Sequence, residues 1–224
     1  MQTMSRRSFL LASLGVASLC LAGCGSGASG AASTSAASAS AVPSSSASSC
    51  VTSASGEYAS GTHHATIEVE GYGAIKLELD ADVAPVTVAN FAKLAGEGFY
   101  DGLTFHRIIE GFMVQGGDPN ENGTGGSDEK IVGEFSDNGH PNSISHVRGT
   151  ISMARSQAYN SASSQFFIMQ ADTPSLDGQY AAFGHVTKGM DVVDAMCEAA
   201  RPTDNNGTIA AADQPRIASV KMDD

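Results

Sequence analysis

The stretch from Phe105 to Asp118 reads FHRIIEGFMVQGGD and is the most informative part of the sequence. It brings an arginine, Arg107, within a few residues of three other distinctive side chains, Phe112, Met113 and Gln115. A second stretch, residues 163–168, reads SSQFFI. Large apolar side chains beside amide groups on strand-like sequence indicate a groove that binds a ligand. The other interpretation of the apolar residues is an ordinary core.

Strand parity sorts the first stretch into two faces, because successive residues of a strand point to opposite sides of the sheet. Phe105, Arg107 and Ile109 are predicted to share one face, and His106 and Ile108 the other. His106 is therefore predicted to point away from Arg107, as a hydrogen-bonded structural residue.

Parity also sorts the second stretch. Phe166 and Ile168 are predicted on one face, and Gln165 and Phe167 on the other. A core strand buries one face, which leaves Phe167 beside a polar residue on the outer one. This arrangement favours a groove over a core position.

The sequence around these stretches predicts a mainly β domain. Apolar and polar residues alternate over 65–69 and 75–79, which indicates a hairpin with Gly71 in its turn. The other strand-like runs are 103–109, 113–116, 131–135, 149–154, 165–169, 181–188 and 217–222.

Two stretches have helical rather than strand periodicity. Apolar residues recur at i, i+3, i+4 and i+7 from Val88, with Pro85 in the predicted first turn and Gly96 and Gly98 as the stop. A second stripe follows Gly189: Val193, Met196, Cys197 and Ala200, ending before Pro202. We therefore expect a closed, eight-stranded antiparallel β-barrel capped by two α-helices.

These motifs, in this order, resemble the active-site signature of the cyclophilins, the peptidyl-prolyl cis-trans isomerases. The resemblance covers Thr62 to Met222. It implies that Arg107 is the catalytic donor and that Gln115 binds the substrate backbone directly, with Gln165 more peripheral. It also implies a proline pocket lined by Phe112, Met113, Phe167, Leu176 and Tyr180, and a substrate-pairing backbone segment at Ala154 and Arg155.

The implied chemistry needs no cofactor, metal or covalent intermediate. Peptide rotation has a barrier of about 18–20 kcal/mol, which arises from the double-bond character of C–N. A donor that hydrogen-bonds the pyramidal proline nitrogen of the twisted amide would lower that barrier. Each tenfold acceleration requires about 1.4 kcal/mol of selective stabilisation.

Two positions depart from the family pattern. Ser175 stands where many cyclophilins have tryptophan, and Tyr180 stands where they have histidine. Because that tryptophan binds cyclosporin, the resemblance leaves inhibitor sensitivity open. Tyr180 still offers an aromatic face and a hydroxyl group.

The N-terminus predicts export and lipid anchoring. Residues 1–23 read as a signal peptide, and Leu21-Ala22-Gly23-Cys24 resembles a bacterial lipobox that places diacylglycerol on Cys24. An ordinary secretory signal is the alternative. Arg6-Arg7 fits either the twin-arginine motif or a plain basic region. The predicted place is the extracytoplasmic face of the cell membrane, where two acyl chains anchor stably.

Residues 24–61 read as the lipidated cysteine and a flexible tether of Ser, Ala and Gly, and residues 62–224 as the isomerase domain. A tether of this composition spans roughly 30–36 Å. A glycosylated stalk is the alternative. A small tethered domain is most simply a monomer.

The charge excludes one class of partner. The chain has 24 acidic and 12 basic residues, a balance that repels nucleic acid. His63-His64 could bind a metal, but no third ligand is evident, so the prediction is that no metal site exists. A disulfide between Cys50 and Cys197 is possible in an exported protein.

The predicted function is a prolyl isomerase that assists the folding of exported or surface proteins. Two alternatives remain open. The first is a module that binds proline-containing segments in the same groove without catalysis as its purpose. The second is a transporter's solute-binding lipoprotein, although about 164 residues is short for two lobes around a cleft.

Overall fold

The computed structural model describes residues 50–224. Its main element is an eight-stranded sheet with the strand order β10-β2-β3-β9-β7-β8-β5-β4. All its strand pairs are antiparallel. The strands are β2 (Thr62–Val69), β3 (Gly73–Asp80), β4 (Phe105–Ile109), β5 (Met113–Gly116), β7 (Thr150–Met153), β8 (Phe166–Met169), β9 (Ala182–Lys188) and β10 (Ile217–Met222).

The predicted hairpin is β2 and β3. Its alternation places Ile67 and Ile75 opposite each other as fully buried partners. Gly71 and Gly73 have φ values of 75° and 118°, which lie in the left-handed region that glycine tolerates best. The period-2 pattern therefore sets both the register and the turn.

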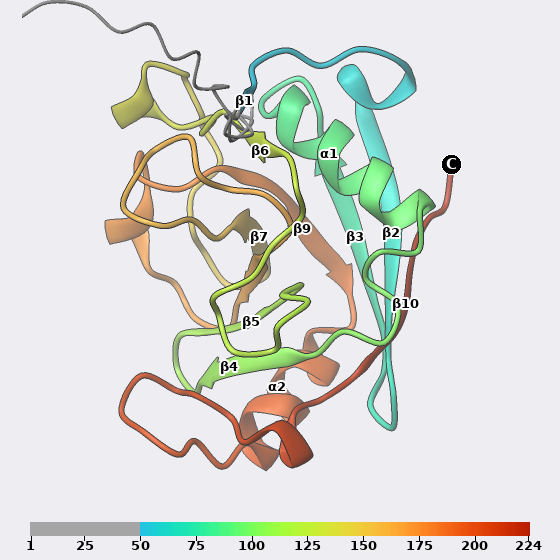
Figure 1. Cartoon of the computed structure of the whole chain (residues 1–224), viewed down its shortest axis with the longest axis vertical. Coiled ribbons are helices and arrows are strands. Elements are labelled where there is room, and N and C mark those ends of the chain that lie inside the picture. The colour runs from blue at the N-terminus through green and yellow to red at the C-terminus, as the bar shows by residue number, and fades with distance from the viewer. Residues whose placement is uncertain (1–49) are drawn as a thin grey trace, which may run out of the picture. The chain divides into compact units, whose positions relative to one another are not determined.

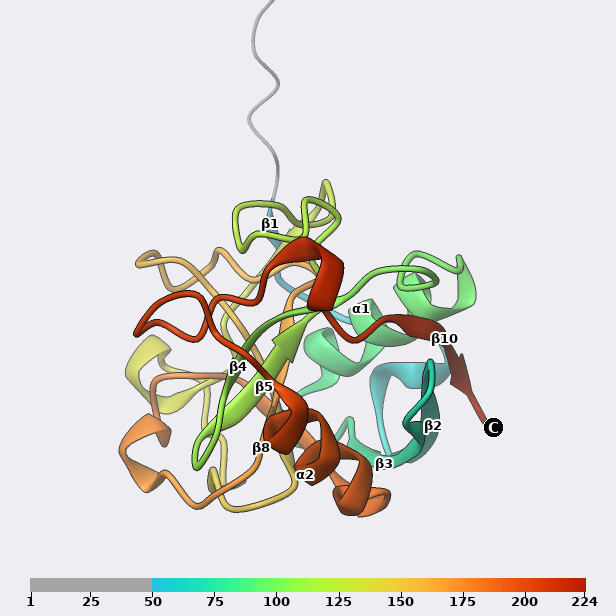
Figure 2. The same cartoon turned by 90° about the horizontal axis from the view of Figure 1, so that it is seen from below.

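The two predicted helices are α1 (Pro85–Gly96) and α2 (Met190–Ala199). Pro85 starts α1, where its missing N–H costs no hydrogen bond. Figure 1 shows α1 beside the upper ends of β2 and β3 and α2 at the opposite end of the sheet, and Figure 2 shows α2 from below. The prediction of two helices that cover a curled sheet is confirmed.

The sheet does not close completely into the predicted barrel. The outer strands β4 and β10 do not form a continuous ladder with each other. Instead, the segments that lead into them exchange backbone hydrogen bonds, from Phe105 N to Pro215 O (2.9 Å) and from Ile217 N to Leu103 O (2.8 Å). The sheet edge is therefore covered by short bridges rather than by an eighth strand pair.

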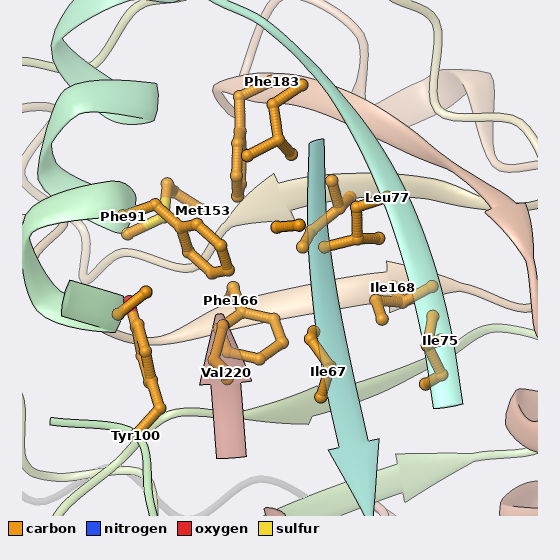
Figure 3. Packing of buried hydrophobic residues seen from close by; sticks show 14 of the residues in the cluster. Ile67, Ile75, Leu77, Phe91, Tyr100, Met153, Phe166, Ile168, Phe183 and Val220 are labelled. Carbon is orange, nitrogen blue, oxygen red and sulfur yellow. The ribbon is translucent and has the colours of Figure 1, made fainter. Parts of the chain in front are cut away.

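The core fills the inside of the curled sheet (Figure 3). Phe166 lies at its centre, with ring centroids 5.6–6.1 Å from Tyr100, Phe91 and Phe105. All four rings are fully buried. Phe166 and Ile168 therefore belong to the core face, as parity predicts.

Two predictions about segment limits are wrong. Of the run 131–135, only Lys130–Ile131 forms a strand, β6. It pairs in parallel with β1 (Cys50–Val51), which the sequence analysis assigns to the tether. Val51, Ala54 and Tyr58 pack against the core, so residues 50–61 belong to the folded part. Apolar residues spaced this widely leave no periodic signal.

Cys50 and Cys197 are both free within the described residues, so the possible disulfide between them is not formed. Cys197 is buried in α2, and burial raises the pKa of its thiol to about 12. No helix among residues 50–224 has both the length and the apolarity to cross a membrane.

A pH-dependent contact joins β2 to Asp224. His63 Nδ1 lies 2.7 Å from Asp224 Oδ2, and His63 Nε2 lies 2.9 Å from the Ser60 carbonyl oxygen. Burial acts to lower the pKa of His63, but the hydrogen bonds and the charge of Asp224 outweigh it and raise that pKa. Partial burial acts to raise the pKa of Asp224, but donors from His64 and His63 hold it below its usual value.

This contact predicts a pH window of stabilisation. A raised histidine pKa stabilises the fold below the unfolded value of about 6.5, and that contribution is lost as pH rises through the folded value. The lowered Asp224 pKa stabilises above about 3.9 and is lost as pH falls through the folded value. Asp224→Asn is expected to lower Tm by up to about 2–4 °C between pH 4.5 and 6, with a smaller difference at pH 8. If thermal unfolding gave the same Tm difference at both pH values, the stabilisation could not come from the His63–Asp224 contact.

Candidate active site

Three neighbouring strands set the predicted site residues side by side. Arg107 on β4 is the register partner of Gln115 on β5, and Gln115 is the partner of Phe167 on β8. Ser152 on β7 continues the row as the partner of Phe167. Residues that lie far apart in the sequence therefore meet on one face of the sheet.

A bulge in β4 turns Arg107 outward. Phe105 pairs with Gly116, and the next pair is Arg107 with Gln115, so His106 is an extra residue without a partner. Phe105 is consequently fully buried in the core, while Arg107 is half-buried on the outer face. The prediction that these two side chains share a face is wrong, because simple parity does not account for a bulge.

The bulge also buries His106. Its side chain is 3% exposed, and neither ring nitrogen has a hydrogen-bond partner among the described residues. The prediction of a hydrogen-bonded histidine is therefore wrong. Burial lowers the pKa of His106; the charge of Asp118 opposes this and that of Arg107 adds to it, so the ring is neutral at neutral pH.

A chain of hydrogen bonds orients the polar side of the site. Arg107 Nη1 donates to Gln115 Oε1 (3.1 Å), Gln115 Nε2 donates to Gln165 Oε1 (2.9 Å), and Gln165 Nε2 donates to the Gly125 carbonyl oxygen (2.8 Å). Each amide is thereby fixed in one orientation. Gln115 therefore holds the guanidinium of Arg107 in place, and Gln165 in turn holds Gln115.

Arg107 also has a second anchor. Its Nε donates to the carbonyl oxygen of Asn206 at 2.7 Å. Asn206 lies in a tight turn whose backbone N–H groups at Asn206 and Thr208 donate to the side chain of Asp204. No periodic pattern predicts this anchor, and the signal for it in the sequence is the turn-forming run Asp204 to Gly207.

The guanidinium of Arg107 remains a charged donor. Burial acts to lower its pKa, and the nearby Tyr180 and Asp204 act in the opposite direction. Nε and Nη1 are engaged, whereas Nη2 makes none of the hydrogen bonds recorded between described residues. One charged N–H group is thus available to a ligand in a half-buried setting.

An apolar pocket lies beside this donor. Met113, Phe167 and Met169 form a buried cluster separate from the main core. Above it opens a pocket of about 220 Å³. Its lining residues are Arg107, Phe112, Met113, Gln115, Ala154, Arg155, Phe167, Leu176 and Tyr180.

The pocket contains every predicted proline-pocket residue. Parity alone suggests that Phe167 points outward into solvent. Its side chain is instead 5% exposed and forms the floor of the pocket. Tyr180 meets Phe167 edge-on at a centroid distance of 5.7 Å. Gln165 does not line this pocket but a neighbouring one.

The side chain of Arg155 has contacts that the sequence does not suggest. Its guanidinium carbon lies 4.8–5.1 Å from the ring centroids of Phe135, Tyr159 and Tyr180. Its Nε also donates to the Gln179 carbonyl oxygen at 2.9 Å. Arg155 therefore holds Tyr180 against the pocket through its side chain.

A buried histidine supports the same wall from behind. His146 is fully buried, and its ring stacks on Phe167 at 6.0 Å and 19°. Nδ1 lies 2.8 Å from Asp177 Oδ1, and Nε2 lies 3.0 Å from Ser152 Oγ. Burial lowers the pKa of His146 despite the opposing effect of Asp177, so a neutral ring that donates to Asp177 and accepts from Ser152 fits both contacts.

Asp177 connects this support to the pocket. Its carboxylate accepts from Ser145 Oγ (2.5 Å), from the His146 backbone N–H (2.7 Å) and from the His146 ring. These donors outweigh its partial burial and hold its pKa below the usual value. Because Asp177 lies between Leu176 and Tyr180 in sequence, its contacts position both pocket residues.

Asp177→Ala is therefore expected to raise KM for a proline peptide about three- to tenfold, with a smaller change in kcat, because the pocket wall loosens. Steady-state kinetics of the variant beside the parent gives both constants. Asp213→Ala, a change of the same type in the short helix Ala211–Asp213, serves as the control and is expected to leave KM unchanged. A KM within experimental error of the parent would contradict this role for Asp177.

Two further predictions concern the lipid anchor and a metal site. Cys24 lies outside the described residues. Within residues 50–224, no group of three His, Cys, Asp or Glu side chains is placed to hold a metal ion.

Comparison with known proteins adds a family to this geometry. Residues 64–222 match the family model described as cyclophilin type peptidyl-prolyl cis-trans isomerase/CLD. Over 128 residues, the chain is 46% identical to peptidyl-prolyl cis-trans isomerase B of Bacillus subtilis, covering 57% of this chain and 86% of that protein. It is 42% identical over 163 residues to a probable peptidyl-prolyl cis-trans isomerase of Brucella suis, covering 67% and 79% respectively.

Solved structures give the same result for the fold. A Cryptosporidium parvum cyclophilin-type isomerase superposes with a TM-score of 0.64 at 28% identity, covering 73% of this chain and 99% of that one. A second structure of that protein, in the presence of the dipeptide Ala-Pro, has a TM-score of 0.63 at 30% identity and covers 72% and 99%.

Proposed function

The chain belongs to the cyclophilin-type peptidyl-prolyl cis-trans isomerases and is an isomerase of that family, and we propose that Arg107 carries its catalytic step. The substrate is an X–Pro bond whose proline ring occupies the pocket floored by Phe167. The proposal rests on one observation above all. A charged, doubly anchored donor borders an apolar pocket of about 220 Å³.

The mechanism follows from what rotation does to the amide. As the C–N bond twists, the proline nitrogen loses conjugation and becomes a hydrogen-bond acceptor. Arg107 donates to that nitrogen more strongly in the twisted state than in either planar state, so it stabilises the transition state selectively. No covalent bond forms, and no proton leaves the arginine.

The groups that bind Arg107 limit how far its side chain must move during catalysis. Its position is set by Asn206 and Gln115 before the substrate arrives, so little movement is needed during rotation. The half-buried setting strengthens the hydrogen bond relative to one in water. Gln115 is placed to hold the substrate backbone next to the same guanidinium.

The proposed substrates are exported or surface proteins that fold at the outer face of the membrane. The sequence of the first 24 residues supports this location through its signal-like segment and Cys24. In the test, the full chain and Cys24→Ala are produced in a bacterium with radiolabelled fatty acid. Label and membrane association in the parent, and loss of both in the variant, are expected. An unlabelled parent in the soluble fraction would overturn the anchoring.

The activity itself is tested by cis-trans exchange of a short proline peptide, followed by NMR. The full chain in detergent is expected to raise the exchange rate far above the uncatalysed one, which has a time constant of about 10–100 s. A folded chain that binds the peptide without accelerating exchange would favour the binding module instead. A chain that neither binds nor accelerates would overturn the proposal.

A further inference from the structure

The charge of the groove is opposite to that of the chain. All 24 acidic residues lie in the described part, against ten basic ones, yet no acidic residue lines the proline pocket or the pocket next to it. Three basic residues do: Arg107, Arg155 and Lys130. An acidic protein thus has a locally basic groove.

The neighbouring pocket continues the proline pocket. It has a volume of about 240 Å³ and shares Gln115, Ala154 and Arg155 with the proline pocket. An extended peptide advances roughly 3.3 Å per residue. A chain with its proline in one pocket therefore places a side chain one to three residues away into the other.

Lys130 contributes an ammonium group to this second pocket. Its Nζ donates to Ser163 Oγ at 3.2 Å, and Thr124 and Gln165 line the same pocket. The strand pair between Cys50 and Lys130 fixes the backbone from which the side chain extends. Of the two acidic residues before Lys130, both line a different pocket, and Glu129 pairs with Lys93 at 2.6 Å.

Within residues 50–224, the hydrogen bonds of Arg155 go to neutral groups. Its hydrogen bonds go to the carbonyl oxygens of Gln179, Ser156 and Gln157, and its other contacts are the ring faces described above. These partners are neutral, so they hold the guanidinium in place without cancelling its field. The remaining lining groups include the hydroxyl of Ser163, which accepts from Lys130 and so keeps its own O–H for a carboxylate oxygen.

We propose that the second pocket selects acidic side chains, so that the preferred substrates carry Asp or Glu within three residues of the proline. This inference rests on the proposed function, because it uses the proline pocket to place the peptide. Lys130 is the residue that determines the preference, and Arg155 adds to it. In a chain with a net charge of −12, the basic groove also draws acidic segments away from the repelling surface around it.

The test uses peptides of one length with a single proline. Glu, Gln or Lys occupies each of the three positions before and after the proline in turn, and NMR exchange gives kcat/KM for each peptide with the full chain. At one position, Glu is expected to exceed Gln about three- to fivefold, as a half-exposed ion pair produces, and Lys to fall below Gln. The Glu/Gln ratio is expected to shrink towards one at about 0.5 M salt.

Variants assign the preference to Lys130. Lys130→Gln is expected to reduce the Glu/Gln ratio, and Lys130→Glu to bring it below one. Lys93→Gln is the matched control, because Lys93 is an exposed lysine paired with Glu129 outside the groove, and the ratio should stay at the parental value.

Equal rates for Glu and Gln at all six positions would overturn the inference, as would a ratio that Lys130→Gln leaves unchanged. Neither result affects the proposed function, which fails only if no peptide is turned over. In that case, peptide affinities from NMR titration still compare Glu with Gln, so the charge preference is tested without catalysis.

Discussion

Replacing Arg107 with alanine is expected to lower kcat/KM for prolyl isomerisation by about 10²–10³-fold. Removal of a single positioned donor to a developing charge has an effect of this size in other enzymes, about 2.7–4 kcal/mol. The loss should appear mainly in kcat, because Arg107 acts on the twisted amide more than on the planar one. NMR exchange measured at saturating peptide separates the two constants.

The fold is expected to survive this substitution. Arg107 is half-buried on the outer face, and its main backbone acceptor, the Asn206 carbonyl oxygen, lies in an exposed turn where water can replace it. Arg107→Lys keeps the charge but loses the planar group that reaches Gln115 and Asn206 together, so it should recover only a small part of the activity.

Arg148→Ala removes an arginine that forms an exposed ion pair with Asp194, and it should retain full activity. If Arg107→Ala kept activity within threefold of the parent, the proposed mechanism would be wrong.

Replacing Glu134 with alanine is expected to reduce the free energy of unfolding by about 3 kcal/mol. Glu134 is 4% exposed and accepts from the backbone N–H groups of Val86 (3.0 Å) and Thr87 (2.8 Å). It also accepts from Thr87 Oγ1 at 2.7 Å. The residue before α1 is Ala84, whose side chain cannot cap, so Glu134 supplies the cap and the negative charge that the helix N-terminus favours.

Thermal unfolding measures this loss. For a domain of this size, about 3 kcal/mol corresponds to a fall in Tm of about 6–12 °C. Glu134→Gln keeps an acceptor oxygen and should lose about a third as much. Equal losses for the two variants would mean that the negative charge, and not the acceptor oxygen that Gln keeps, is what Glu134 contributes. A loss below about 1 kcal/mol in Glu134→Ala would contradict the capping role.

Much of the architecture was predictable because each element has a local signal. The β2–β3 hairpin follows from strict alternation, and α1 follows from its stripe and from Pro85. The opposite faces of Phe166 and Phe167 follow from parity, because β8 has no bulge, whereas the burial of Phe167 does not. The residues of the proline pocket came from the family resemblance rather than from any local pattern.

The parts that escaped prediction depend on contacts across the fold. The bulge at His106 reverses the parity of Phe105, and nothing in the local sequence marks it. The cap from Glu134 joins residues 47 or 48 positions apart. The stacking of Arg155 on three rings requires three loops to meet, which no periodicity encodes.

The pairing of β1 with β6 has a mechanical consequence. The two strands are parallel. The backbone N–H of Val132, just after β6, donates to the Val51 carbonyl oxygen at 2.9 Å. Tension applied to the chain upstream of Cys50 therefore loads this pair in shear before it reaches α1 or the main sheet. The strand loaded first is β6, which contains Lys130. A force strong enough to separate β1 from β6 would therefore also displace the residue proposed to select the substrate.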